Sequence, residues 1–165
     1  MGRDERHEGF DAWYGREAPR VLASVTLAVG DRWLAEDATA EAFARALERW
    51  PAVRDARSPA AWVFTVALNQ VRTIARRRQV ERRILRRHRE DVVHPAGEPD
   101  VALWRAVAAL PPRMRTIVAL RYVGDLPQAQ IAEVLGISPG TVASTLHDAR
   151  ATLATRLADS HGGAR

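Results

Sequence analysis

The stretch LPQAQIAEVLGISPGTVASTLHDARATLATRL, residues 126–157, decides the fold of this chain because it predicts two helices joined by a tight turn. Pro127 suits the first position of a helix, and Gly136 follows where the chain must reverse in a left-handed conformation. Ser138 and Pro139 then start the second helix, the serine as N-cap and the proline in the first turn. Apolar side chains at three-to-four spacing predict the buried faces: Ile131, Val134, Leu135, Val142, Leu146, Ala149, Leu153 and Leu157. The pattern is typical of a helix-turn-helix, which inserts its second helix into the DNA major groove; an ordinary helical hairpin is the alternative.

Composition excludes several classes of protein. The 165 residues contain no cysteine, so disulfides, thiolate metal sites and cysteine nucleophiles are excluded. No apolar run approaches the roughly 20 residues that span a bilayer, and the charged start MGRDERHEG does not read as a signal peptide. We therefore expect a cytoplasmic protein that does not insert into membranes.

The positive charge is concentrated in the middle of the chain. All 25 basic residues are arginine, and nine of them lie between Thr65 and Arg89 against one acid, Glu81. The segment from Gly124 to Ala149 has three acids and no arginine. A basic segment this one-sided indicates a polyanionic partner, with a solvated arginine-rich helix as the alternative.

Helical periodicity extends over most of the rest. It predicts helices over residues 10–29, 32–50 and 59 to about 87, the second capped by Asp31 and ended by Pro51, the third started by Ser58-Pro59. Apolar residues assigned to the core of the first two helices include Phe10, Trp13, Trp33, Phe43 and Trp50.

The segment HREDVVHPAGEPD, residues 88–100, has two prolines, a glycine and four acids without helical period, and we interpret it as a linker. Helices resume over residues 101–110 and 113–123, before the helix-turn-helix. The expected fold is all-α, with an N-terminal domain (8–87), a flexible linker (88–100) and a C-terminal helix-turn-helix domain (101–159).

Three segments in this order resemble the extracytoplasmic-function (ECF) sigma factors, the promoter-specificity subunits of bacterial RNA polymerase. GDRWLAEDATAEAFARALERW at 30–50 is similar to their polymerase-binding helix. SPAAWVFTVALNQVRTIARRR at 58–78 is similar to their promoter-melting and minus-10-reading segment. ALPPRMRTIVALRYVGDLPQAQIAEVLGISPGTVASTLHDAR at 109–150 is similar to their minus-35 domain.

The resemblance implies a function and a set of contacts. The chain would bind core RNA polymerase and promoter DNA without catalysis or cofactor, and an anti-sigma factor is a common partner in this family. Polymerase-binding positions would be Asp37, Ala38, Thr39, Ala40 and Glu41. Minus-10 DNA would be contacted by Trp62, Asn69, Gln70, Arg72, Arg76, Arg77 and Arg78, although core packing is the favoured role for Trp62. Minus-35 DNA would be contacted by Ser138, Gly140, Thr141, Ser144, Thr145 and Asp148.

The chain departs from the family pattern in the recognition helix and in the polymerase-binding helix. Where the family commonly has basic residues in the recognition helix, this chain has Ala143, Thr145 and Asp148, which predicts a weaker or differently specified minus-35 contact. In the polymerase-binding helix, Ala40 replaces the usual glutamine and Ala38-Thr39 replace Leu-Val, which removes a polar contact and some apolar surface.

Two other functions are weighed against this one. A helix-turn-helix regulator acting without polymerase would not need the segments 30–50 and 58–78. A hydrolase could use Glu36, Asp37 and Glu41 with His88 and His94, but their spacing matches no metal site.

Overall fold

The computed structural model describes residues 9–84 and 101–162, and every regular element within these ranges is helical. The elements in chain order are α2 (Phe10–Val29), α3 (Arg32–Glu48), α4 (Trp50–Arg54), α5 (Pro59–Ile84), α6 (Val101–Ala108), α7 (Pro112–Val118), the π-helix η1 (Ala119–Val123), α8 (Gln128–Leu135) and α9 (Pro139–Gly162). The all-α fold class is confirmed. The predicted linker, residues 88–100, lies entirely outside the described residues, and α9 runs past residue 159, the predicted end of the C-terminal domain.

Capping chemistry sets the boundaries of the N-terminal half, residues 9–84. Gly30 ends α2 with φ 75°, and its N–H donates to Thr26 O at 2.8 Å. The carboxylate of Asp31 accepts from Leu34 N at 2.9 Å and so starts α3, as predicted. Ser58 caps α5 by accepting from Ala61 N at 3.2 Å. These local signals end α2 and start α3 and α5 at the predicted residues.

The second helix ends earlier than predicted. α3 stops at Glu48, and Pro51 does not end it but occupies the first turn of a separate short helix, α4. The kink turns Trp50 inward, where its ring lies 4.8 Å from Trp13 and 5.3 Å from Phe10. This aromatic cluster closes one end of the N-terminal core.

The second correction in this half concerns Trp33. The prediction placed it in the core, whereas its side chain is 72% exposed, in the first turn of α3. Leu34 and Ala35 take the buried positions instead. Trp33 makes no ring contact, hydrogen bond or ion pair with the described part of the chain.

The C-terminal half, residues 101–162, contains the predicted helix-turn-helix, α8 and α9. Gly136 ends α8 with φ 64°, and Ser138 Oγ accepts from Thr141 N at 3.0 Å to start α9. Pro127 stands at the N-cap of α8 rather than at its first position. The helices predicted over 101–110 and 113–123 become α6, which ends at Ala108, and α7, which starts at Pro112 and continues into η1.

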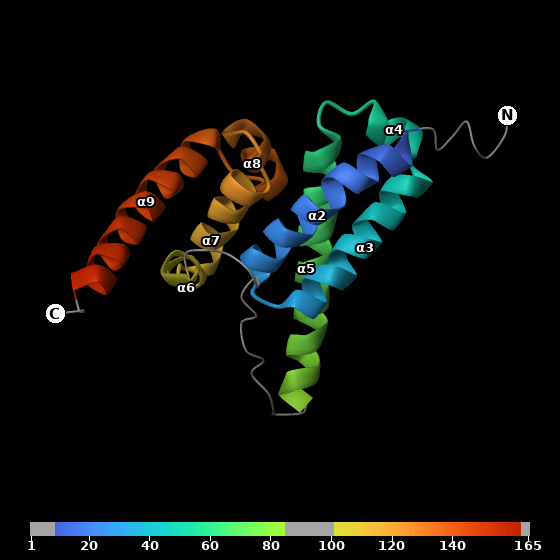
Figure 1. Ribbon diagram of the computed structural model, residues 1–165. Helices are drawn as coiled ribbons and strands as arrows, with labels where there is room; N and C mark the ends of the chain where they lie inside the picture. Colours follow the sequence, from blue (N-terminus) through green and yellow to red (C-terminus); the bar gives the residue numbers. More distant parts are fainter. Residues whose placement is uncertain (1–8, 85–100, 163–165) are drawn as a thin grey trace, which may run out of the picture.

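The two halves are packed together around one apolar core (Figure 1). α2 lies against α7 and η1, and α5 lies against α8. Ser24, which is fully buried in α2, donates to Ala119 O at 3.0 Å. The same carbonyl accepts from Gly124 N at 2.8 Å and thereby closes the π-turn. A Cβ at Gly124 would lie 2.9 Å from Phe64 Cζ, so this close approach of the halves needs a glycine.

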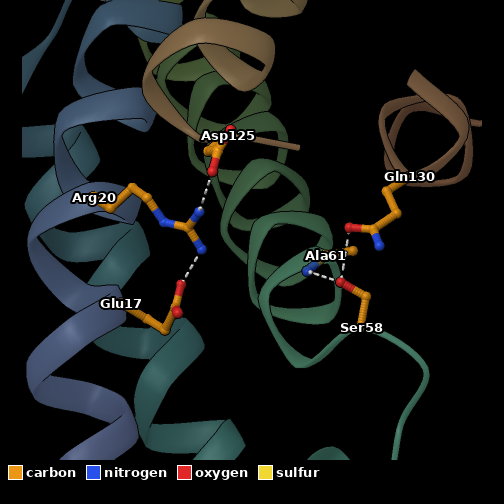
Figure 2. A network of polar contacts seen from close by, with 6 residues as sticks. All are labelled: Glu17, Arg20, Ser58, Ala61, Asp125 and Gln130. Carbon is orange, nitrogen blue, oxygen red and sulfur yellow. Dashed lines mark hydrogen bonds and ion pairs between the residues drawn. The ribbon is translucent and has the colours of Figure 1, made fainter. Parts of the chain in front are cut away.

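Polar contacts surround this interface (Figure 2). Arg20 of α2 pairs with Glu17 and lies 3.9 Å from Asp125 of the other half. Ser58 donates to Gln130 Oε1 at 2.9 Å.

A second group of contacts links the halves elsewhere. Arg57 forms an ion pair with Glu133. Arg115 donates to Ala28 O at 3.2 Å and to Ala108 O at 2.8 Å, and its burial lowers the pKa of this guanidinium.

No helix of the described residues is both long and apolar enough to cross a bilayer.

Candidate protein and nucleic-acid interfaces

The basic residues predicted to contact minus-10 DNA lie along the second half of α5. Arg72, Arg76 and Arg77 are exposed, and Arg76 and Arg77 make no ion pair with the described residues. Arg78 differs because its guanidinium lies 3.1 Å from Asp31 Oδ2, whose other oxygen caps α3. Arg76 and Arg77, without an ion pair, therefore lie beside the hydrogen-bonded Arg72 and the ion-paired Arg78, and a surface of four guanidinium groups suits a phosphate backbone.

The uncharged minus-10 positions lie one to three turns earlier on α5. Asn69 is exposed, and its Oδ1 accepts from Arg72 Nη1 at 3.1 Å, while Gln70 is half-buried. Trp62 is half-buried and packs against the core. Trp62 thus packs partly against the core, its role at minus-10 DNA stays a prediction, and Asn69 is the accessible polar group of the set.

Part of α5 borders the C-terminal half. Arg72 lines a cavity of about 370 Å³ together with Pro112, Arg113, Thr116, Leu135 and Ile137. The surface assigned to minus-10 DNA thus adjoins the helix-turn-helix in this arrangement.

The recognition helix α9 buries Val142, Leu146 and Ala149 and exposes Gly140, Ser144 and Asp148. Thr141 and Thr145 are half-buried. The exposed residues share one face of α9, opposite the buried face, and their contact with minus-35 DNA stays a prediction. Asp148 is exposed, as its position relative to Leu146 predicts.

The hydroxyl groups of α9 are used within the helix. Ser144 Oγ donates to Thr141 O at 3.1 Å, and Thr145 Oγ1 donates to the same carbonyl at 2.8 Å. The first arginine of the helix, Arg150, donates to the hydroxyl of Tyr122 at 3.2 Å. Without exchanging these bonds, the serine and threonine can offer DNA only acceptor lone pairs.

The five positions predicted to bind polymerase divide into two groups on α3. Asp37 and Ala40 are exposed, and Glu41 is half-buried with its carboxylate 2.7 Å from Arg45 Nε. Ala38 and Thr39 are buried, at 0% and 6% exposure, so they support the helix from inside. Thr39 Oγ1 has no hydrogen-bond partner among the described residues.

A groove runs beside these positions, between α2 and α3. It consists of two adjoining hollows of about 440 and 330 Å³ that share Tyr14, Ala40 and Phe43. Thr39 lines the larger hollow. We call this feature the α2–α3 groove; its lining is mostly apolar.

The exposed members of the three predicted sets therefore lie on or at the start of three different helices, α3, α5 and α9. No cluster of three or more histidine, cysteine or acidic side chains that could hold a metal occurs in the parts of the chain that the structure describes. His88 and His94, named for the hydrolase alternative, lie outside those parts.

Sequence profiles of two sigma-70 regions match the two halves of the chain. The profile of sigma-70 region 2 matches residues 13–81, and that of sigma-70 region 4 matches residues 100–153. The protein is thus of the sigma-70 type, with a region 2 that an autonomous helix-turn-helix regulator would not need.

Individual relatives place it more finely. The RNA polymerase sigma-E factor of Streptomyces coelicolor is 30% identical over 151 residues, which cover 90% of this chain and 85% of that protein. The ECF RNA polymerase sigma factor SigL of Mycobacterium tuberculosis is 35% identical over 146 residues, 82% of this chain and 81% of that protein. The chain belongs to the ECF RNA polymerase sigma factors, which bind core RNA polymerase and direct transcription initiation at specific promoters.

A solved structure shares the fold. The sigma factor RpoE of Bartonella quintana, crystallised in complex with the anti-sigma factor NepR, superposes with a TM-score of 0.76 at 21% identity, covering 90% of this chain and 96% of that one.

Proposed function

We propose that this sigma factor uses its three exposed surfaces for three separate contacts. The outer face of α3 binds core RNA polymerase, the arginines of α5 hold the minus-10 DNA, and α9 reads the minus-35 element. In this scheme residues 8–87 and 101–159 act as two domains joined by the linker 88–100.

One observation carries the assignment of α3 in particular. Asp37 and Ala40 are exposed beside an apolar groove, and Asp37 makes no ion pair with the described residues. α3 lies away from α9, with α2 and α5 between them (Figure 1). A partner protein can therefore bind α3 without covering the recognition helix.

We further propose that the chain acts only by binding, in the cytoplasm, where bacterial RNA polymerase acts, and with no catalytic step or cofactor of its own. The described residues offer no metal cluster that would favour a hydrolase. An anti-sigma factor is also an expected partner, and the RpoE structure is itself a complex with one.

The test of this proposal reverses the charge on α3. Asp37→Arg combined with Glu41→Arg should abolish co-purification with core RNA polymerase, because a cationic face would replace the anionic one and bulky side chains would border the groove. Circular dichroism should show an unchanged helical fold, since neither side chain is part of the core.

Asp55→Arg is the matched control, because Asp55 is an exposed acid of the same half that lies outside α3. The single variant D37R should weaken binding, whereas D55R should bind as the unmodified chain does. Undiminished co-purification of folded D37R/E41R would remove α3 from the interface.

A further inference from the structure

Trp33 is the most exposed of the large apolar side chains in the described residues, at 72%. It lies on a regular helix whose neighbouring positions, Leu34 and Ala35, are buried. An exposed tryptophan contributes little to the core of its own chain, whereas tryptophan is enriched among the side chains that dominate binding energies at protein interfaces.

The position of Trp33 links it to the surface proposed for polymerase. At 100° per residue, Trp33, Asp37, Ala40 and Ala44 lie within a narrow sector of α3, and all four are exposed. This row, which we call the α3 stripe, has acids along one side and the α2–α3 groove along the other.

The charge around the α3 stripe favours one kind of partner. Asp37, one turn after Trp33, is exposed and unpaired with the described residues, while Glu36 is neutralised by Arg32 at 2.8 Å. A guanidinium placed over the face of an exposed indole gains cation–π attraction, and a carboxylate one turn away strengthens the preference for a cation.

The groove beside the stripe adds a second, independent observation. Its lining is mostly apolar and includes Thr39, whose own hydroxyl is buried. An apolar side chain of a partner loses contact with water on entering such a recess, and this favours binding. The α3 stripe and the groove together offer an aromatic anchor, a carboxylate and an apolar recess.

We propose that Trp33 anchors the contact with core RNA polymerase, stacking against an arginine of a polymerase segment that also enters the α2–α3 groove. This inference rests on the proposed role of α3. It accounts for how this chain binds with Ala40 and Ala38-Thr39 where its family commonly has larger side chains.

The test titrates purified core RNA polymerase into the fluorescently labelled full-length chain and follows anisotropy. Trp33→Ala should raise the Kd about tenfold or more, as removal of a central interface tryptophan typically does. Trp33→Phe should retain more affinity than Trp33→Leu, because only phenylalanine keeps an aromatic face for the cation. An unchanged thermal midpoint is expected for each variant because the side chain is exposed.

Tyr122→Ala is the matched control, since Tyr122 is an exposed aromatic residue (57%) of the other half, in η1. It should leave the Kd for core polymerase unchanged. Equal affinities of W33F and W33L would show that Trp33 does not stack against a cationic side chain of polymerase, which would overturn the inference.

The outcome can be separated from that of the α3 proposal. If D37R/E41R loses core polymerase while W33A binds within twofold of the unmodified chain, Trp33 is not an anchor and the role of α3 stands. If both variants bind normally, both proposals fall. If W33A binds core normally but its holoenzyme loses promoter affinity, Trp33 contacts DNA and the inference is overturned.

Discussion

The two helices proposed to meet DNA, α5 and α9, are built from opposite chemistry. Between Asn69 and Gln79, α5 carries four arginines, two of them exposed and unpaired with the described residues. Between Pro139 and Ala149, α9 carries hydroxyl groups, one acid and no arginine. Phosphate contacts supply affinity and base contacts supply specificity. We therefore expect the N-terminal half to supply most of the affinity for promoter DNA.

The largest expected effect comes from removing the free arginines of α5. Arg76→Ala with Arg77→Ala should weaken polymerase-dependent promoter binding by about tenfold or more, and should lower the slope of log affinity against log salt by about 1.5. Adding Arg78→Ala should weaken binding further by a smaller factor, because Asp31 already engages that guanidinium. A salt titration of promoter binding measures both quantities.

Arg16→Ala with Arg49→Ala is the matched control, since both arginines are exposed and belong to the same half but lie outside α5. If the control pair and the α5 pair lose affinity equally, general charge rather than the α5 surface explains the binding. If the triple variant binds unchanged at every salt concentration, α5 does not hold DNA.

A smaller effect on affinity is expected from α9. Ser144→Ala with Thr145→Ala should change promoter affinity by less than about threefold, but should alter which upstream sequences are preferred. Binding to a library of minus-35 variants measures that preference. An unaltered preference would mean that these two positions do not face base edges.

The smallest effect is expected at the acid of α9. Asp148→Arg should tighten promoter binding about threefold at low salt and less at physiological salt, because the exposed charge is screened. If Asp148 instead accepts from a cytosine amino group, the change should weaken the native promoter specifically. No effect on any DNA at low salt would mean that this face of α9 does not approach DNA.

The elements of the fold could be predicted because their signals are local. Asp31, Ser58, Gly136 and Ser138 each act through bonds to residues within four positions, and each ended or started a helix as predicted. Pro51 was the exception, because a proline that ends one helix and one that begins the next have the same sequence signature.

What the sequence could not predict depends on contacts between distant residues. The packing of α2 against η1 joins Ser24 to Ala119, 95 positions later, and neither residue is distinctive by itself. The π-turn at Ala119 likewise has no local sequence pattern that predicts it. The Ala119 carbonyl accepts hydrogen bonds both from Gly124 N in its own half and from Ser24 Oγ in the other half.

The sequence indicated which helices carry the candidate sites better than it indicated which residues of those helices are exposed. The burial of Ala38 and Thr39 follows from a period they share with Leu34, Ala35, Ala42 and Ala46, a signal that was present in the sequence. Trp33 was missed because a tryptophan is ordinarily assigned to a core, although its spacing from Asp37 and Ala40 placed it on their face. The roles of the individual residues stay predictions.

The shared core between the halves also makes their separation an equilibrium. Each 1.4 kcal/mol by which the packing of α2 on η1 favours the closed arrangement lowers the population of separated halves about tenfold. A partner that requires separated halves therefore binds with its intrinsic affinity multiplied by that population. A protein that clamps the halves together would in turn inhibit such a partner from a distance, without touching the surface that the partner uses.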